Sequence, residues 1–425
     1  MSNVNNATLW LPYAQMQTIS PPFEVIKSQG SCLTLADGRQ LIDAVASWWT
    51  ACHGYNHSHI ISAIQQQASI LPHVMLGGFI HPQAQKLATR LADLLPQDLS
   101  HIFYSESGSV AVEIAMKMAL QFWINQNEKQ RQQFICFKHG YHGDTFYAMS
   151  VCDPEEGMHR LFHPVLPQQY FHELPNNDDL LAAFEKWLAE YAHTVAGMLI
   201  EPLVQGAGGM KMHSPDTLYA LCTLAKRYGI IVIFDEIFTG FGRTGSLFAL
   251  EQAEVIPDIL CLSKALTGGT LPLAVTIANR HIYDGFLSSD PEKAFMHGTT
   301  FMGNALACAA ANASLDLFEQ EPRLTQVAAI EKILLQKLLP LKDVPGVKDV
   351  RVKGAIGAVQ LARSVTQDLN WFKQQFVNEG IWCRPFGDIV YTTPAFTIEP
   401  DVLIKITTAI QNQVKLWSQQ YYRKE

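Results

Sequence analysis

The sequence has few charged residues and no excess of positive charge. Only 16% of its 425 residues are charged, and 31 Lys and Arg stand against 39 Asp and Glu, which gives a net charge of −8. Nucleic-acid backbones and anionic membrane surfaces attract basic proteins, so this balance argues against both kinds of partner. A small molecule is the expected partner.

The sequence also shows no cysteine pairing, no signal-peptide pattern in its first residues and no long apolar run. The start MSNVNNATLW has neither the charged beginning nor the apolar middle of a signal peptide, and no apolar run approaches the ~20 residues that span a bilayer. No C-x-x-C motif joins the eight cysteines, which is typical of reduced thiols and argues against a disulfide scaffold or a metal site. We therefore expect a cytoplasmic protein with no bound metal.

What the sequence does contain is an alternation of short apolar runs and amphipathic helices. The runs are HIFYS, QFICFK, AGMLIEP, GIIVIFDE, DILCLSKA and LAVTIAN. Fully apolar strands separated by helices predict an α/β fold with a mostly parallel sheet that helices cover on both faces. No internal repeat or long linker interrupts the pattern.

The two ends of the chain have a different pattern. Near the start, CLTLADGRQLID predicts a hairpin that turns at Asp37 and Gly38. Near the end, VRVKGAIGAVQLA and IWCRPFGDIVYTTP predict strands, and DLNWFKQQFVNEG and VLIKITTAIQNQVKLW predict helices. We expect residues 1–54 and 319–425 to form a small α+β domain, and residues 55–318 to form the large domain.

Three polar elements follow strands of the predicted sheet, and ligands of such sheets bind beyond the carboxyl ends of the strands. Lys264 follows DILCLS, Asp235 follows GIIVIF, and Ser107, Gly108 and Ser109 open a helix. A lysine in a low-dielectric place has a lowered pKa and can form a Schiff base. A glycine turn at a helix start offers N–H groups to a phosphate.

Each element has a simpler explanation when it is taken alone. A lysine at a strand end is commonly a surface residue, an aspartate there is commonly a helix cap or a metal ligand, and a Ser-Gly-Ser turn is commonly only a turn. Together they match pyridoxal 5′-phosphate (PLP), whose aldehyde bonds a lysine, whose ring nitrogen pairs with an acid and whose phosphate sits at a helix start.

Six ordered motifs extend this match over almost the whole chain. They are YSESGSVAVEIAMKMA, GYHGDTF, EPLVQGAGGM, FDEIFTGFGRTG, LSKALTGGTLPLA and HGTTFMGNALACA. The sequence thereby resembles the class III PLP-dependent aminotransferases of fold type I. The resemblance implies a two-domain α/β fold, PLP as the cofactor, and a homodimer with shared active sites.

The resemblance also assigns roles to the residues that would hold the cofactor. Lys264 would bond it and move the proton, Asp235 would pair with the ring nitrogen, and Tyr141 would stack on the ring. The phosphate would lie among Gly108, Ser109, Thr299 and Thr300, with Thr300 reaching in from the neighbouring subunit. The family has proline where this sequence has Thr299.

Within the class, the sequence is most similar to the branch that acts in biotin biosynthesis. The motifs that carry this likeness are WLPYAQM, ASWWTACHGYNH, YHGDT and WCRPFGDIVYTTP. The likeness implies that S-adenosyl-L-methionine donates the amino group and 8-amino-7-oxononanoate accepts it, giving 7,8-diaminononanoate. The implied substrate-binding residues are Tyr13, Trp48, Tyr141, Asp144, Arg243, Gly298, Arg384 and Tyr391.

Arg384 is the expected clamp for a substrate carboxylate, because its planar guanidinium can bind a carboxylate through two hydrogen bonds. Many ω-aminotransferases of the class have a glutamate at the place of Ala207, which pairs with this arginine. Alanine cannot form that pair, so the arginine should stay available, and this favours the biotin branch. Glu201, at a strand end, is expected to be a supporting carboxylate.

Other functions remain open from the sequence alone. An ω-aminotransferase, or an enzyme of the same step that takes lysine as donor, would share all the cofactor residues. A PLP-fold protein without catalysis would share the fold. Histidines near each other invite a metal hypothesis, but they lack a matching set of carboxylates; they are His53, His57, His59, His139 and His142.

Overall fold

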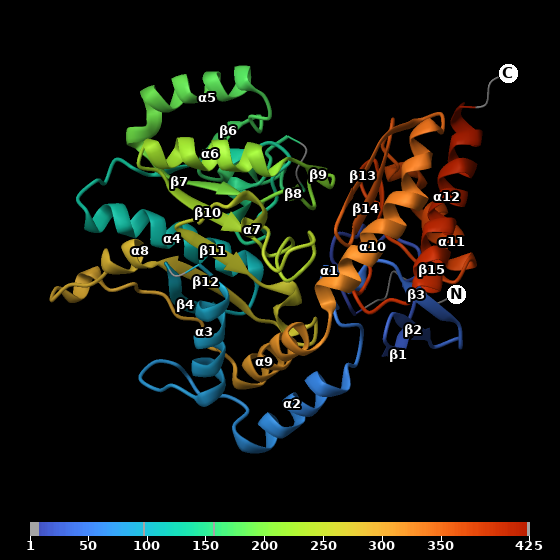
Figure 1. Ribbon diagram of the computed structural model, residues 1–425, viewed down its shortest axis with the longest axis horizontal. Coiled ribbons are helices and arrows are strands. Elements are labelled where there is room, and N and C mark those ends of the chain that lie inside the picture. Colours follow the sequence, from blue (N-terminus) through green and yellow to red (C-terminus); the bar gives the residue numbers. More distant parts are fainter. Residues whose placement is uncertain (1–7, 97, 156–157, 423–425) are drawn as a thin grey trace.

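The computed structural model describes residues 8–96, 98–155 and 158–422. Figure 1 shows a larger part with a central sheet and a smaller part in which the blue start and the red end of the chain lie together. Within the described residues the central sheet has seven strands in the order β4-β12-β11-β10-β7-β5-β6. Their bounds are β4 Leu99–Ser105, β5 Gln133–Phe137, β6 Tyr170–His172, β7 Val195–Ile200, β10 Ile231–Asp235, β11 Ile259–Leu262 and β12 Ala274–Asn279.

The prediction of an α/β fold with a mostly parallel sheet is confirmed, with one exception. Strands β11, β10, β7, β5 and β6 are parallel to their neighbours in that series, whereas β12 is antiparallel to both β11 and β4. Only residues 263–273 separate β11 from β12. A parallel return needs a crossover of about a dozen residues or more, usually a helix. The short connection therefore turns the chain back beside β11, and this connection carries Lys264.

Both faces of the sheet are buried, which explains the unbroken apolar runs. On β10, Val232 and Phe234 belong to one buried cluster and Ile231 and Ile233 belong to the other. Helix α4 packs on the second face, while α3, α6 and α9 supply apolar side chains to the first. The helices of this part are α2 Ser58–Ile70, α3 Pro82–Leu94, α4 Gly108–Asn125, α5 Asp178–Tyr191, α6 Pro215–Arg227, α7 Leu250–Ala253, α8 Arg280–Asp284 and α9 Ala305–Gln320.

In the part of the chain that the structure describes, the smaller part contains two sheets and three helices of ten residues or more. One sheet joins β1 Val25–Gln29, β2 Cys32–Leu35 and β3 Gln40–Asp43 to β15 Ile381–Trp382, and the other has the order β13-β14-β16. The predicted hairpin at Asp37 and Gly38 is confirmed, because β2 and β3 pair antiparallel. The remaining elements are β13 Val347–Lys353, β14 Ile356–Leu361, β16 Ile389–Thr392, α10 Arg323–Leu338, α11 Leu369–Asn378 and α12 Pro400–Tyr422.

Two segments that we predicted as single strands each form two. VRVKGAIGAVQLA turns back at Gly354, whose φ of +53° favours glycine, and β13 pairs antiparallel with β14. IWCRPFGDIVYTTP divides into β15 and β16, which belong to different sheets. Pro385 lies between them, and proline supplies no N–H to a strand ladder.

The start and the end of the chain meet through β3 and β15, where Ile42 pairs with Ile381 in a parallel ladder. This pairing supports a small domain built from both ends, and the boundaries near residues 54 and 318 stay predictions. Among the described residues, no helix is long and apolar enough to cross a membrane.

Candidate active site

The polar elements singled out in the sequence meet at the carboxyl ends of the central strands. Asp235 is the last residue of β10, and Lys264 begins a 3₁₀ turn two residues after β11. Helix α4 begins at Gly108, where an added Cβ would lie 2.8 Å from Cδ1 of Ile237, the second residue after Asp235. The sheet topology thus brings the lysine, the aspartate and the helix start to one place.

Lys264 is partly buried and is held in an unusual backbone conformation. Its φ is +43°, in the left-handed region that residues other than glycine seldom adopt. Its Nζ lies 4.9 Å from the centre of the Trp49 ring. Burial lowers the pKa of Lys264, and the carboxylates of Asp235, Glu201 and Asp144 oppose this shift. The net effect favours the unprotonated amine, which is the nucleophilic form.

Asp235 is buried and paired with a histidine. His142 Nδ1 lies 2.8 Å from Asp235 Oδ2, and both side chains are almost fully buried. The other oxygen, Oδ1, accepts a hydrogen bond from the backbone N–H of Ile237 at 3.1 Å. The sequence draws attention to His142 only as one of several neighbouring histidines, so this pair was missed. The only available sign was its position between Tyr141 and Asp144 in GYHGD.

Asp144 joins several predicted substrate residues through its carboxylate. Oδ2 accepts a hydrogen bond from Tyr13, Oδ1 accepts one from Tyr141 Oη at 2.8 Å, and His159 Nε2 lies 3.1 Å from Oδ1. Burial raises the pKa of Asp144, but the hydrogen bonds from His159, Tyr13 and Tyr141 outweigh it and lower that pKa to about 2. His159 carried no motif in the sequence and was missed.

The first turn of α4 and the loop at Gly143 form a tight cradle. Ser109 Oγ accepts a hydrogen bond from the Asp144 N–H at 3.1 Å. Gly143 has a φ of +125°, and an added Cβ would lie 2.3 Å from Ser109 Oγ. The first N–H groups of a helix have no carbonyl partner within it and carry the positive end of the helix dipole. This cradle therefore suits an anionic group.

These residues fit pyridoxal 5′-phosphate. A phosphate suits the first turn of α4, a ring nitrogen suits the buried carboxylate of Asp235, and an aldehyde suits the lowered-pKa amine of Lys264. Tyr141 lies between these groups and the substrate residues, since its backbone N–H donates to Glu201 and its hydroxyl donates to Asp144. The donor set matches the three reactive parts of that one molecule.

An aromatic and cationic wall stands beside the Asp144 cluster. Tyr13 meets Trp48 edge to face at 5.6 Å, and the Arg384 guanidinium lies 4.5 Å from the centre of the Trp48 ring. Among the described residues, no carboxylate forms an ion pair with Arg384, which leaves its fork available. Tyr391 is buried behind this wall, where its hydroxyl accepts a hydrogen bond from Trp49 Nε1 at 3.2 Å.

The backbone around the two tryptophans is strained. Ala46, Ser47 and Trp49 have φ values of +48°, +63° and +66°. Asp43 holds this segment, because its carboxylate accepts hydrogen bonds from the N–H groups of Val45 and Ser47 at 2.9 and 2.6 Å. In this backbone conformation the Trp48 side chain points outward and is 41% exposed, while the Trp49 side chain is buried. Strained backbone of this kind persists only where the surroundings enforce it, often at functional sites.

Glu201 and Ala207 flank the cofactor side of the site. Glu201 accepts hydrogen bonds from the N–H groups of Gly206 and Tyr141 at 2.9 and 3.1 Å. Burial raises the pKa of Glu201 to about 7, against the opposing effect of His142. Ala207 packs against the core and offers no carboxylate to an arginine.

Four predicted residues make their described contacts away from the Lys264 and Asp144 groups. Arg243 is buried, and its Nη1 donates to the carbonyl groups of Ala355 and Pro394 at 3.2 and 2.9 Å, while Nη2 finds no partner among the described residues. Burial lowers the pKa of Arg243 to about 10. The others, on an outer loop, are Gly298, Thr299 and Thr300.

The outer loop that holds Gly298, Thr299 and Thr300 lies at the surface of the protein. The Thr299 hydroxyl donates to Glu106 Oε2 at 2.7 Å, and the carbonyl group of Thr300 pairs with His73 Nε2 at 3.0 Å. Gly298 and Thr300 are exposed. Their roles toward phosphate and substrate therefore stay predictions. The described residues contain no group of three or more His, Cys, Asp or Glu that could hold a metal ion.

An α/β sheet with a lysine and a buried aspartate at its carboxyl edge, facing a helix start, defines the PLP-dependent transferases of fold type I. The comparisons with known proteins agree with this class. The chain belongs to the class III aminotransferase family, whose model matches residues 13–414, and it is an aminotransferase.

Individual relatives cover almost the whole chain. An adenosylmethionine-8-amino-7-oxononanoate aminotransferase of Buchnera aphidicola subsp. Acyrthosiphon pisum is 44% identical over 95% of this chain and 95% of its own. The solved structure of the Methanocaldococcus jannaschii enzyme of that name has a TM-score of 0.92 and 34% identity, covering 96% and 97%. An amine transaminase from an uncultivated Pseudomonas species, solved in a PLP-bound form, has a TM-score of 0.88 and 29% identity, covering 96% and 98%.

Proposed function

We propose that this aminotransferase binds PLP and moves the amino group of S-adenosyl-L-methionine to 8-amino-7-oxononanoate, the step of biotin biosynthesis that gives 7,8-diaminononanoate. The relatives with that name support the choice, and so does Arg384, which has no acidic partner among the described residues. Residue 207 is alanine, so it cannot form the ion pair with Arg384 that a glutamate at this position would form.

PLP, when bound, supplies an electron sink that stabilises the carbanion formed after a proton leaves the amino acid. The protein supplies the proton transfers. Nζ of Lys264, whose pKa burial lowers, accepts the proton from the α-carbon of the donor. Asp235, anchored by His142 at 2.8 Å, would hold a protonated ring nitrogen by charge.

Substrate binding is assigned to the aromatic and cationic wall beside the Asp144 cluster. Arg384 would clamp the carboxylate, and the Trp48 ring would cover the aliphatic chain. Burial raises the pKa of Asp144, but its hydrogen bonds outweigh this effect and lower the pKa to about 2. The Asp144 carboxylate therefore stays ionised across the physiological pH range. Together with Tyr13 and Tyr141, it offers polar contacts to an amino group or to the adenosyl part of the donor.

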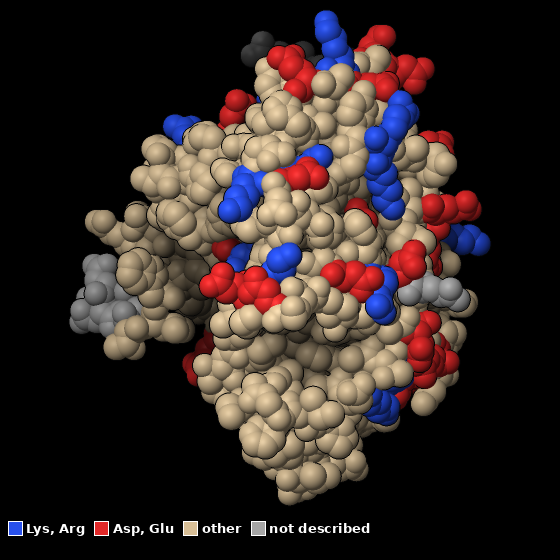
Figure 2. Space-filling model, turned by 90° about the vertical axis from the view of Figure 1, so that its left-hand side faces the viewer, with Lys and Arg blue, Asp and Glu red and all other residues tan. Residues whose placement is uncertain are grey.

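We also propose a homodimer in which Thr300 completes the phosphate site of the partner. Residues 44–85 contain no Asp, Glu, Lys or Arg. The lower part of the face in Figure 2, where α2 and the loop after it lie, is nearly free of charge. Large apolar side chains are exposed in this region and on the nearby outer loop; they are Ile70, Met75, Phe79, Ile80, Met296 and Phe301. An apolar surface of this kind marks an interface with another protein surface.

The dimer is tested by mixing two inactive variants. Lys264→Ala and Thr300→Val are each purified, then unfolded and refolded together. If sites are shared, each mixed dimer contains one site with both native residues. About half of the dimers in a one-to-one mixture are mixed, so the mixture should regain up to about half of one site's activity per dimer. Absence of any regained activity, or a monomer mass in light scattering, contradicts the proposal.

Single-turnover spectroscopy tests the donor. The PLP-loaded enzyme is mixed with S-adenosyl-L-methionine, L-lysine or 4-aminobutyrate, and the loss of the bound cofactor's visible band is followed. We expect rapid bleaching with S-adenosyl-L-methionine and slow or no bleaching with the others. If lysine bleaches the cofactor faster, lysine is the donor. If 4-aminobutyrate does so, the enzyme is an ω-aminotransferase.

The free thiols of the described cysteines suit the cytoplasm, where we place this reaction.

A further inference from the structure

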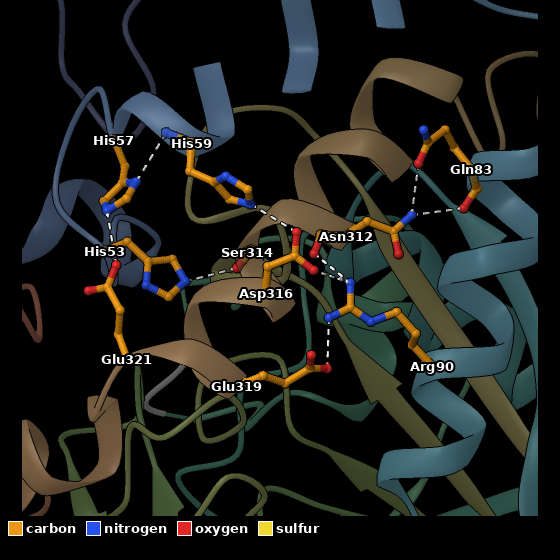
Figure 3. A network of polar contacts seen from close by, with 10 residues as sticks. All are labelled: His53, His57, His59, Gln83, Arg90, Asn312, Ser314, Asp316, Glu319 and Glu321. Carbon is orange, nitrogen blue, oxygen red and sulfur yellow. Dashed lines mark hydrogen bonds and ion pairs between the residues drawn. The ribbon is translucent and has the colours of Figure 1, made fainter. Parts of the chain in front are cut away.

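A chain of buried polar side chains ends on the backbone beside Lys264. Arg323 Nε donates to His53 Nδ1 at 2.9 Å, and His53 Nε2 lies 3.0 Å from Ser314 Oγ. Ser314 Oγ donates in turn to the carbonyl group of Ala265 at 3.4 Å. Figure 3 shows His53 reaching Ser314 on α9 within a larger polar network. The side chains of Arg323, His53 and Ser314, which form this hydrogen-bond series, are all buried.

The direction of each hydrogen bond in this chain follows from the arginine. A guanidinium has only donors, so His53 must accept at Nδ1 and carry its proton on Nε2. The Nε2–H group then donates to Ser314 Oγ, which leaves the serine hydroxyl proton free to donate to Ala265. Burial and the charge of Arg323 both lower the pKa of His53, which agrees with a neutral ring.

The anchor of the chain is fixed at the junction of α9 and α10. Arg323 is the first residue of α10, and its Nη2 lies 2.8 Å from Glu321 Oε2 while Nη1 donates to Gln326 at 2.9 Å. Beside it, the same α9 helix is tied to α2 and α3, because Asp316 pairs with His59 and with Arg90, each at 2.8 Å (Figure 3). Arg323 can therefore hold His53 in one orientation.

The turn that receives this chain is strained and closely packed. Lys264 has φ +43°, a left-handed conformation that is strained for a residue other than glycine. The Ala265 carbonyl also accepts from the Gly268 N–H at 2.9 Å, which closes the turn. An added Cβ at Gly268 would lie 3.2 Å from His53 Cδ2, so the histidine ring also packs against the turn.

We infer that His53 is a positioning residue for the aminotransferase reaction: the chain Arg323, His53, Ser314 fixes the Ala265 carbonyl and thereby holds the turn that aims Lys264. None of the three residues belongs to the groups assigned above to the substrate or the cofactor, and they act through the backbone. The inference rests on the aminotransferase class and is independent of which amine is the donor.

Hydrogen exchange of the cofactor-free protein tests the turn directly. Ser314→Ala and His53→Leu remove one link each, and both should speed exchange of the Leu266 and Gly268 amides about tenfold. Ser418→Ala is the matched control, because Ser418 is a buried serine that donates to the Pro345 carbonyl at 2.6 Å in the smaller part. It should leave exchange at the turn unchanged. Equal exchange at the turn in Ser314→Ala and the native protein would overturn the inference.

Kinetics of the loaded enzyme provide the second readout. Misplacing a reacting group by up to ~1 Å costs as much as about 100-fold in rate. We expect kcat to fall about 10- to 100-fold in Ser314→Ala, with KM for both substrates within about twofold of native. His53→Gln keeps an acceptor and a donor, so it should be faster than His53→Leu. Equal rates for those two, or a loss of kcat no larger than in Ser418→Ala, would contradict positioning. The exchange result stands even if the proposed donor is wrong.

Discussion

Replacing Arg384 with alanine should selectively weaken the binding of a substrate carboxylate. The guanidinium lies 4.5 Å from the Trp48 ring centre, and no acidic side chain among the described residues competes for it. A charge-assisted hydrogen-bond pair contributes about 2–3 kcal/mol, and each 1.36 kcal/mol is a factor of ten. Loss of the pair should therefore lower kcat/KM for 8-amino-7-oxononanoate about 30- to 150-fold.

A comparison of the acceptor with its methyl ester isolates this interaction. For the native enzyme, esterification removes the carboxylate charge and should cost a similar 30- to 150-fold, by the same estimate of about 2–3 kcal/mol. For Arg384→Ala, acid and ester should react at rates within about threefold, since the partner is already gone. Arg384→Lys keeps the charge but loses the planar fork, so its discrimination should lie between the two.

Stability provides the control for this prediction. The contact of Arg384 with a partly exposed Trp48 contributes only about 0.5–1 kcal/mol, so the melting temperature should change by a few degrees at most. If Arg384→Ala still discriminates acid from ester as strongly as the native enzyme, the carboxylate binds elsewhere. Arg243, whose Nη2 has no hydrogen-bond partner among the described residues, would then be the residue to examine.

Three further predictions concern the cofactor side of the site. Lys264→Ala should abolish transamination and the visible band of lysine-bound cofactor, and normal turnover by this variant would remove the mechanism. Gly143→Ala places a Cβ 2.3 Å from Ser109 Oγ at a φ of +125°. Cofactor affinity in a fluorescence titration should therefore fall more than about tenfold, a cost above ~1.4 kcal/mol. Unchanged affinity would show that Gly143 and Ser109 do not form a tight cradle for the phosphate. Glu201 has a folded-state pKa raised by burial from 4.5 to about 7, so the folded cofactor-free protein binds the extra proton between those values. Its unfolding free energy in urea should therefore fall, relative to Glu201→Gln, as pH rises from about 4.5 to about 7, and a rise over that range would show the opposite shift.

The local chemistry of the chain was readable from the sequence. Apolar runs predicted the strands of the central sheet, because a strand covered on both faces needs apolar side chains at every position. Lys264, Asp235 and the opening of α4 were also identified, since each lies directly after a strand. The aminotransferase class followed from the order of these motifs and is confirmed by the family match.

Strand direction and strand number were less accessible where connections were short. The antiparallel β12 follows from a connection too brief for a crossover helix, and the division of IWCRPFGDIVYTTP between two sheets depends on partners far away in the chain. Periodicity describes the faces of an element but says nothing about its neighbours. Pairing of β3 with β15 likewise joins residues more than 300 positions apart in sequence.

The residue types that follow each strand, and with them the possible cofactor chemistry, could be read along the chain. Which side chains meet at the site depends on how the chain folds. His142 pairs with Asp235, His159 with Asp144, Asp43 with the strained tryptophan segment, and His53 lies behind the Lys264 turn. The physical reason is that hydrogen bonds and burial act over a few ångströms in space. Spacing along the chain does not encode that distance once the chain has folded.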